Sequence, residues 1–510
     1  MSSKLASCKS VSLIGLKGSI VNVEANMSMG LAQFTIVGLP DASVNESRAR
    51  VLTAFGALGV NIQECHITVN LAPASLPKRG SGFDLAIAVV VLASAGVLER
   101  DAIVETAFLG ELGLDGRVLP VKGILPEVLA AREAGLKQVY VPIGNETEAK
   151  LVDGIQVCAV GHLAEVMNEF GGKIKIPDYV PAMKSLDARS RPKGKIDFAD
   201  VLGQKQAKFA LEVAAAGFHN MMMTGPPGTG KSMLAARLPT ILPDLEAEDS
   251  LVATCIYSIS GENIENLITI PPFESPHHTA TTPSIIGGGS GSIRPGSISR
   301  AHCGVLFLDE APEFSPRVLQ TLRQPLESGE VVIDRARSHE VFPARVLLVM
   351  AANPCPCGMY SSQNDKCKCS SIERRRYFGR LSGPLLDRID IMTTVENVTK
   401  SHLKSDTPES SAEVKARVEE ARRRAKFRWK DTPWKVNSQV PGSYLRRIKL
   451  KDTTLLDALA ESVDRQVLSM RGADRALRLA WTLADLTGAD EPASKELLAA
   501  LQLKGNGLDA

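Results

Sequence analysis

Short apolar runs alternate with helical periodicities along the first 170 residues. Residues 47–59, 83–96 and 124–135 repeat apolar side chains at helical spacing or form apolar runs of helical length. Strand-like runs separate them: VSLIGL (11–16), QFTIVGLP (33–40), HITVNLAP (66–73) and KQVYVPI (137–143). This alternation predicts an α/β or α+β domain over residues 1–172.

The pattern changes twice further along the chain. Residues 173–196 are rich in Pro, Gly, Lys and Ser without an apolar period, so they predict a linker. Residues 197–400 begin with a helix, a strand, a glycine loop and another helix, which is typical of a parallel-sheet nucleotide domain. A second linker near residues 400–411 opens a helical segment, 401–510. We therefore expect an α/β multidomain protein with a C-terminal helical lid.

Composition narrows the setting. The chain has 510 residues, 44% hydrophobic and 23% charged, as globular multidomain proteins do. Its 59 Lys+Arg against 57 Asp+Glu create no global field for nucleic acid, so any basic footprint must be local. The longest apolar stretch, residues 85–98, is too short to span a bilayer. Nine cysteines without an export signal predict reduced thiols in a cytoplasmic protein without a membrane partner.

A phosphate loop follows the first strand of the second domain. Its glycines allow backbone N–H groups to cradle a phosphate, and the next helix adds partial positive charge. The lysine supplies charge to the β- and γ-phosphates, and the final hydroxyl can ligate Mg²⁺. The loop fits G-x4-G-K-[ST] and consists of Gly225, Pro226, Pro227, Gly228, Thr229, Gly230, Lys231 and Ser232.

Two later strands end in polar residues that complete such a site. The apolar run 305–308 is followed by Asp309, which would complete the Mg²⁺ shell, and by Glu310, which would polarise the attacking water. The apolar run 346–352 is followed by Asn353, whose side-chain amide can reach the γ-phosphate or the lytic water. The order of loop, acids and amide is that of the AAA+ ATPase core. No guanine-reading N-K-x-D motif occurs in the sequence, so ATP is favoured over GTP.

Longer strings carry a family resemblance. PHHTATTPSIIGGGSGSIRPGSISRAHCGVLFLDEAPEF (276–314), NPCPCG (353–358) and LSGPLLDRIDI (381–391) resemble the Mg-chelatase-like AAA+ proteins of the YifB/ComM family. The resemblance runs nearly end to end and implies a homo-hexameric ATPase. ComM proteins of this family are DNA helicases that drive branch migration, which implies single-stranded or branched DNA as a partner. A tetrapyrrole metal chelatase motor, an ATP-dependent protease and a DNA-independent remodeller are the alternatives.

The resemblance also assigns two arginines. Arg388 matches the expected arginine finger, which would neutralise transition-state charge on a neighbouring subunit's ATP. The alternative is a surface pair with Asp387 or Asp390. Arg471 matches the sensor-2 position, and Arg475, one turn further on, is the alternative.

Further candidates surround the site. The related families use an insertion, here residues 256–300, and a hairpin, here 331–345, as pore elements. The hairpin tip offers phosphate contacts at Arg335, Arg337, Ser338 and His339, although an ordinary surface hairpin remains the alternative. The basic helix 414–430 could bind DNA or form a solvated face. His277 and His278 could suggest a metal site or a catalytic base, but without a matching partner spacing they are interpreted as structural or loop–ligand contacts.

Four cysteines form two C-x-C pairs separated by a polar loop: Cys355, Cys357, Cys367 and Cys369. Four thiolates can close a tetrahedron around Zn²⁺, although the usual structural spacing is C-x2–4-C. Such a shell leaves no open position for chemistry. We therefore expect a structural zinc site between Asn353 and Arg388.

The first domain resembles the proteolytic domain of Lon, a ribosomal S5 domain 2-like fold, through FLGELGLDGRVLP (108–120) and the segment 124–142. That domain uses a Ser–Lys dyad. Here Gly82 stands at the serine position, with Ser81 one residue early, and Leu125 stands at the lysine position. The resemblance therefore implies a protease-like domain without proteolysis, with Lys122 leaving a shifted dyad as the alternative.

Overall fold

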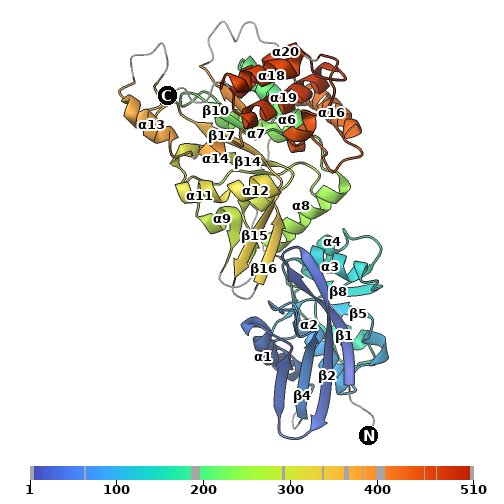
Figure 1. The fold of residues 1–510 in the computed structure, drawn as a ribbon. Coiled ribbons are helices and arrows are strands. Elements are labelled where there is room, and N and C mark those ends of the chain that lie inside the picture. Colours follow the sequence, from blue (N-terminus) through green and yellow to red (C-terminus); the bar gives the residue numbers. More distant parts are fainter. Residues whose placement is uncertain are drawn as a thin grey trace.

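The computed structural model describes residues 5–62, 65–184, 196–289, 293–335, 338–360, 367–381, 383–397, 408–452, 454–466 and 468–505. An N-terminal domain lies at one end, the ATPase core lies in the middle, and helices of the lid cover the far end of the core (Figure 1). The α/β multidomain architecture expected from the sequence is confirmed. No helix in the described part of the chain combines the length and the apolar character needed to cross a bilayer.

A seven-stranded mixed sheet forms the N-terminal domain. Its strands, in spatial order, are β3 (Gln33–Val37), β4 (Cys65–Ala72), β2 (Lys17–Met29), β1 (Leu5–Ile14), β5 (Thr106–Phe108), β8 (Gln138–Pro142) and β9 (Gln156–Val160). A small hairpin joins β6 (Glu111–Leu112) to β7 (Val118–Leu119). The helices are α1 (Ala42–Ala57), α2 (Asp84–Ser94), α3 (Ile124–Glu133), α4 (Glu146–Ala149) and α5 (Leu163–Glu169).

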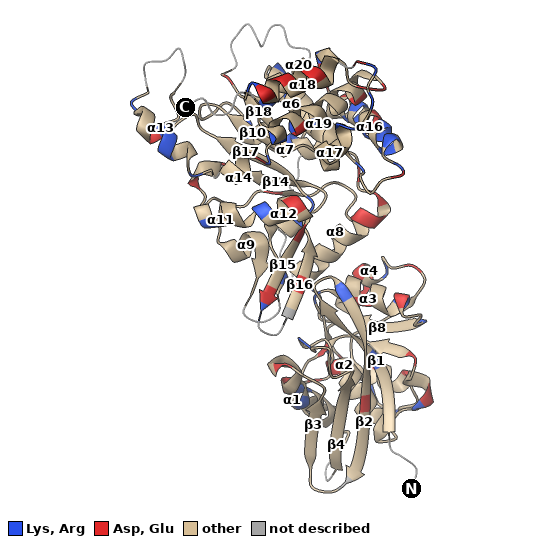
Figure 2. Cartoon of the chain, in the orientation of Figure 1, with Lys and Arg blue, Asp and Glu red and all other residues tan. Residues whose placement is uncertain are grey.

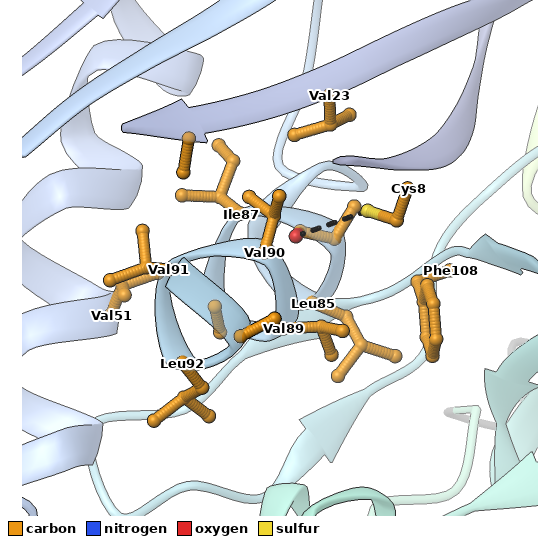
Figure 3. Close-up of a cluster of buried hydrophobic side chains, with 14 of the residues drawn as sticks. Cys8, Val23, Val51, Leu85, Ile87, Val89, Val90, Val91, Leu92 and Phe108 are labelled. Atoms are coloured by element: carbon orange, nitrogen blue, oxygen red, sulfur yellow. Dashed lines mark hydrogen bonds between the residues drawn. The ribbon is translucent and has the colours of Figure 1, made fainter. Parts of the chain in front are cut away.

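Helix α2 is the centre of this domain. All of its residues are buried, because its sequence is apolar on every side. Figure 3 shows Leu85, Val89 and Leu92 among side chains from β1, β2 and α1. Its first residue, Asp84, forms an ion pair with Arg50, whose Nε lies 2.5 Å from Asp84 Oδ2. A helix that is apolar all round is stable in this position only because the sheet and its neighbouring helices enclose it.

Part of the segment expected as a linker folds back on this domain. The Tyr179 hydroxyl donates to Glu165, and Lys184 pairs with Glu148. Residues 173–184 contain no helix or strand, and residues 185–195 lie outside the described part, so the linker bounds stay a prediction.

A five-stranded parallel sheet forms the ATPase core. Its order is β11 (Phe273–Glu274), β14 (Val305–Leu308), β17 (Leu347–Ala352), β10 (Met221–Thr224) and β18 (Ile391–Thr394). The core helices are α6 (Lys205–Gly217), α7 (Lys231–Ile241), α8 (Ala247–Ser260), α9 (Thr282–Ile286), α10 (Ser297–Arg300), α11 (Pro316–Thr321), α12 (Arg323–Ser328), α13 (Ser371–Phe378) and α14 (Gly383–Leu386). Two hairpins extend from it: β12 (Gly287–Gly288) with β13 (Arg294–Pro295), and β15 (Glu330–Arg335) with β16 (Ser338–Pro343).

The lid comprises α16 (Ser411–Arg428), α17 (Gly442–Leu445), α18 (Thr454–Asp464), α19 (Met470–Thr487) and α20 (Ser494–Lys504). Its helices α16 and α19 pack on α6, and their apolar residues join the core of the parallel sheet. A buried polar contact ties the two parts, because His219 bonds to Asp390 at 2.9 Å and to Thr482 at 2.8 Å. The lid is therefore anchored on the core rather than loosely tethered.

The two domains meet where the core's hairpin reaches the first sheet. Strand β16 lies against β1, and α8 lies against α3. Arg79 Nη1 and Glu340 Oε1 are 2.7 Å apart across this junction. Gly15, at φ +61°, has no room for a side chain, since an added Cβ would lie 2.7 Å from the Val341 carbonyl oxygen.

Candidate ATPase site

The phosphate loop connects β10 to α7 at the carboxyl edge of the parallel sheet. Gly225 is required by packing, because an added Cβ would lie 2.2 Å from the Val395 carbonyl oxygen. Gly228 and Gly230 have φ of +79° and +91°, a region that favours glycine. The Thr229 hydroxyl donates to the Pro226 carbonyl at 2.9 Å and closes the loop. The loop thus has the glycine backbone and the following helix N-terminus that an anion site requires.

Lys231 begins α7 and points back over the loop. Its Nζ donates to the carbonyls of Gly225 at 2.6 Å and Pro226 at 2.8 Å. It also lies 3.3 Å from Asn353 Oδ1, at the end of β17. Burial lowers the pKa of Lys231, while the nearby carboxylates of Asp309 and Glu310 oppose that shift. The structure thus brings the loop lysine and the expected amide together.

Ser232 and Asp309 meet across the loop. The Ser232 hydroxyl donates to Asp309 Oδ2 at 2.6 Å, joining the start of α7 to the end of β14. A hydroxyl and a carboxylate oxygen are ligands that Mg²⁺ accepts while it keeps most of its waters. These two residues therefore fit the magnesium ion of a nucleotide site, and when bound the ion would neutralise phosphate charge.

Glu310 follows directly and has a left-handed backbone, with φ of +51°. A non-glycine residue in this conformation is uncommon and turns the side chain away from the strand direction. Its Oε2 lies 3.3 Å from Nδ1 of His278, a residue that precedes α9. The sequence interpretation of His278 as a structural or loop contact missed this position beside the expected catalytic carboxylate.

The arginines expected to act on the nucleotide share a different place. Arg388, Arg471 and Arg475 line a cleft of about 600 Å³ between core and lid. Arg388 pairs with Glu327, not with Asp387 or Asp390 as the surface-pair alternative has it. No residue of the loop 225–232 is among the described residues that line this cleft. The structure therefore groups Arg388 with Arg471 in a cleft that the described residues of the phosphate loop do not line.

The two sensor-2 candidates differ in how firmly their guanidinium groups are bound within the chain. Arg475 Nη1 donates to the carbonyls of Ile389 at 2.6 Å and Leu386 at 3.2 Å. Arg471 is 77% exposed and reaches only the Asp387 carboxylate, at 3.3 Å, among the contacts described for it. Arg475 is thus tied to the backbone, and Arg471 keeps a guanidinium that a ligand could engage.

The four cysteines converge into a cluster, with all four sulfurs within 4.8 Å of one another. The Sγ–Sγ distances are 3.3 Å for Cys355–Cys357, 3.6 Å for Cys355–Cys367 and 3.7 Å for Cys357–Cys367. Zn–S bonds of about 2.3 Å in a tetrahedron place sulfurs about 3.8 Å apart, so the cluster fits zinc. The Met359 backbone N–H, followed by bonds with the neighbouring thiols, lowers the pKa of Cys357 to about 6.

This cysteine cluster lies against the phosphate loop. Gly358, at φ +74°, faces Pro227 so closely that an added Cβ would lie 2.7 Å from the Pro227 Cδ. On its other side, Arg374 donates to the Cys369 carbonyl at 3.3 Å and stacks 4.0 Å from the Tyr360 ring centroid. The cysteine cluster therefore packs directly beside the phosphate loop of the ATPase site.

The residues at and beside the protease dyad positions are tied to other partners. Ser81, Gly82 and Lys122 line a cavity of about 340 Å³ at the domain junction. The Ser81 hydroxyl donates to Glu111, and Leu125 is fully buried. Lys122 lies against the core, since a Cβ on Gly261 would be 2.7 Å from its Cε. The absence of proteolysis stays a prediction, supported by a serine whose hydroxyl is bonded to a carboxylate.

The hairpin expected at 331–345 is formed by β15 and β16. At its end, His339 Nδ1 lies 2.6 Å from Asp334 Oδ1, and both side chains are exposed. Arg335 ends β15, whereas Arg337 and the side chain of Ser338 lie outside the described part. The described end of the hairpin thus includes the acidic Asp334 and the basic Arg335.

The basic helix α16 is largely structural. Arg422 donates from Nε to the Ala215 carbonyl at 2.9 Å, and Arg428 pairs with the buried Asp485. Trp429 is buried, while Phe427 is 73% exposed. The inward arginines hold the lid on the core, and only part of the basic run faces solvent.

In the parallel sheet the phosphate loop follows β10, the amide follows its neighbour β17, and the paired acids follow β14 beyond it. This arrangement defines a P-loop ATPase core of the AAA+ class. Three family profiles match the chain: "Magnesium chelatase, subunit ChlI" over residues 197–403, "Subunit ChlI of Mg-chelatase" over 23–145, and "Magnesium chelatase, subunit ChlI C-terminal" over 408–504.

Full-length relatives refine this class. The chain is 45% identical to an uncharacterized protein of Mycobacterium tuberculosis, with 98% of each chain covered. It is 37% identical to competence protein ComM of Haemophilus influenzae, covering 96% of this chain and 95% of ComM. It is 38% identical to the uncharacterized protein YifB of Escherichia coli, covering 94% and 92%. The chain belongs to the Mg-chelatase-like AAA+ ATPase family of ComM and YifB.

The resemblance of the first domain to Lon is also confirmed. The chain is 28% identical to Lon protease 2 of Bacillus subtilis over 169 residues, 30% of each chain. That similarity is short and concerns the fold, since the dyad positions differ as described above.

Proposed function

We propose that this chain is a hexameric AAA+ motor that acts on DNA, a ComM-like helicase that promotes branch migration during recombination and natural transformation. In the catalytic step, Lys231 holds the β- and γ-phosphates, Ser232 and Asp309 hold Mg²⁺, and Glu310 accepts a proton from the attacking water. Asn353 orients that water or the γ-phosphate. Each of these side chains lies at the carboxyl edge of the parallel sheet.

The position of Arg388 carries the proposal of a ring. A guanidinium stabilises phosphoryl transfer only where it touches the γ-phosphate. Arg388 and Arg471 line a cleft whose described walls exclude their own phosphate loop. We infer that a neighbouring copy brings its nucleotide to them, and repetition of this head-to-tail contact gives a ring when its rotation closes.

Support for DNA comes from the hairpin and from the relatives. The β15–β16 hairpin projects from the core with Arg335 and His339 near its end, where a strand in a ring pore would pass. The similarity to competence protein ComM agrees with the DNA substrate that the family resemblance implies. Helix α16 contributes little, because its inner arginines bind within the chain. Figure 2 shows Lys and Arg on separate elements, α12, α13 and α16 among them.

A Mg-chelatase-type or other protein-remodelling ATPase without a DNA substrate is the second candidate. The three chelatase-subunit profiles favour it. The two candidates differ in what stimulates ATP hydrolysis. A motor on DNA should hydrolyse ATP several-fold faster with single-stranded or branched DNA, whereas the second candidate should respond to no DNA.

The decisive assay follows branch migration of a four-way junction with ATP and with a non-hydrolysable analogue. We expect migration with ATP alone and none with Glu310→Gln, which should bind ATP without hydrolysing it. For the ring, Lys231→Ala and Arg388→Ala subunits should each be inactive alone. Mixed, they should recover part of the activity, because some interfaces then pair an intact loop with an intact finger. Full activity of Arg388→Ala would contradict the proposed ring.

We also propose that the cysteine cluster holds one structural Zn²⁺, bound by Cys355, Cys357, Cys367 and Cys369. The sulfur separations support this assignment. We expect about one zinc per chain by elemental analysis. Cys355→Ser should lose the metal, while Cys158→Ser, in the first domain, should retain it.

A further inference from the structure

Helix α13 and the residues just before it concentrate positive charge. Residues 367–381 contain five Lys or Arg residues and one acidic residue, whereas the whole chain has a formal net charge of only +2. The acidic residue, Glu373, caps the helix, because its Oε2 accepts from the Ser370 N–H at 2.7 Å and from the Ser370 hydroxyl at 3.0 Å. This segment is therefore a local basic footprint, which a nearly neutral chain needs in order to bind an anionic polymer.

Two of the five cations hold the segment in place. Arg374 donates to the Cys369 carbonyl at 3.3 Å and stacks 4.0 Å from the centroid of the Tyr360 ring. Arg380 Nη1 lies 2.7 Å from Glu313 Oε2, just after the acids of the ATPase site. These contacts fix α13 against the cysteine cluster and the core, so the helix presents a defined outer face.

The other three cations are Lys368, Arg375 and Arg376, and all three are exposed. No ion pair within the described part of the chain includes any of them. Ile372, one turn before Arg376, is 71% exposed and shares the face of Arg375 and Arg376 by helical spacing. The outer face of α13 thus offers cations and an apolar side chain that the chain itself does not engage.

This face lies away from the hairpin that we propose for the ring pore. Figure 1 shows α13 on the far side of the core from the end of the β15–β16 hairpin, and Figure 2 shows Lys and Arg on α13 there. The two surfaces would therefore meet different parts of a nucleic acid. A branched DNA supplies both parts, because one arm can enter a ring while another duplex arm stays outside it.

We propose that the outer face of α13, with Lys368, Arg375 and Arg376, binds the phosphate backbone of a branched DNA outside the ring pore. This inference rests on the proposed function as a motor on DNA. Cations that have no carboxylate partner can neutralise phosphates without first breaking an ion pair, and they release condensed counterions when they do so. Such contacts fix the position of the DNA and do not read its base sequence.

The test compares binding of a four-way junction and of a single-stranded oligonucleotide to the full-length chain at several salt concentrations. We expect Arg375→Gln combined with Arg376→Gln to weaken junction binding about tenfold near 0.1 M salt. The slope of log Kd against log salt should fall by about two, because two phosphate contacts are lost. Arg375→Lys combined with Arg376→Lys keeps the charge and should restore both quantities. Binding of the single strand, which fits the pore, should change less than about twofold.

A matched control separates this surface from a general effect of charge. Arg447→Gln combined with Lys449→Gln removes the same charge from exposed positions between α17 and α18. This control should bind the junction within about twofold of the parent. Unfolding temperatures identify misfolded variants, and the single substitutions Arg375→Gln and Arg376→Gln, each lowering the slope by about one, then replace the double variant.

The outcomes are distinguishable. Equal junction affinities and salt slopes for the parent and the Arg375–Arg376 variant would overturn the inference and favour an acidic protein as the partner of this face. An equal loss in the Arg447–Lys449 control would overturn it as well. Failure of the parent chain to bind either DNA would instead overturn the proposed function.

Discussion

Gly358 offers a direct measure of how the cysteine cluster supports the phosphate loop. In Gly358→Ala the new residue must adopt φ near +74°, which costs about 1–2 kcal/mol for an L-residue. Its Cβ would also lie 2.7 Å from Pro227 Cδ, closer than real Cβ contacts come, so the loop must shift. If about 1.4 kcal/mol of that strain falls on the nucleotide-bound state, KM for ATP rises about tenfold.

The matched control is Gly59→Ala in the first domain. Gly59 has φ of +71°, but no atom lies within 4 Å of its added Cβ. Both variants should lose the free energy of the left-handed backbone in denaturant titrations, Gly358→Ala somewhat more because of its contact with Pro227, and only Gly358→Ala should weaken ATP binding. ATP titrations of the hydrolysis rate and of a fluorescent analogue measure this. Equal KM values for the two variants would refute a mechanical contact between the cluster and the loop.

Two further predictions concern buried polar groups. Thr482→Val removes a hydrogen-bond partner of both His219 and Asn437. We therefore expect the free energy of unfolding to fall by about 1–3 kcal/mol. A fall below about 0.5 kcal/mol would contradict a stabilising contact between core and lid at this residue. Burial, and then the Glu148 charge, raises the pKa of Glu127 well above 4.5. The raised pKa contributes stability that is full below pH 4.5 and is lost as pH rises through the folded value. Glu127→Gln should therefore gain stability relative to the parent as pH rises from 4.5 to 8, and a pH-independent difference in denaturant midpoints would contradict this.

Local signals predicted the ATPase half of the site. A buried apolar strand directly precedes the phosphate loop, the acids after β14 and the amide after β17 in the sequence. The residues next to each motif were therefore enough to predict it. Strand β2 was missed, although Val21, Val23 and Ala25 alternate with polar residues and are all buried. Its period of two was available, but the polar half of the strand resembles a loop.

Other features depended on packing that no local pattern contains. The contact between His278 and Glu310 requires knowing that β11 and β14 are neighbours in a parallel sheet. The grouping of Arg388 with Arg471 requires knowing how the lid docks on the core. In the same way, the charge run of α16 could not distinguish Arg422, which binds the Ala215 carbonyl, from its solvent-facing neighbours.

The contacts between the first domain and β16 mean that the sequence of each domain must fit the surface of the other. Because Gly15 abuts the Val341 backbone and Arg79 pairs with Glu340, the first domain touches the same hairpin that we propose meets DNA. Grafting this domain from one relative onto the motor of another would preserve function only where those four positions are inherited as a set.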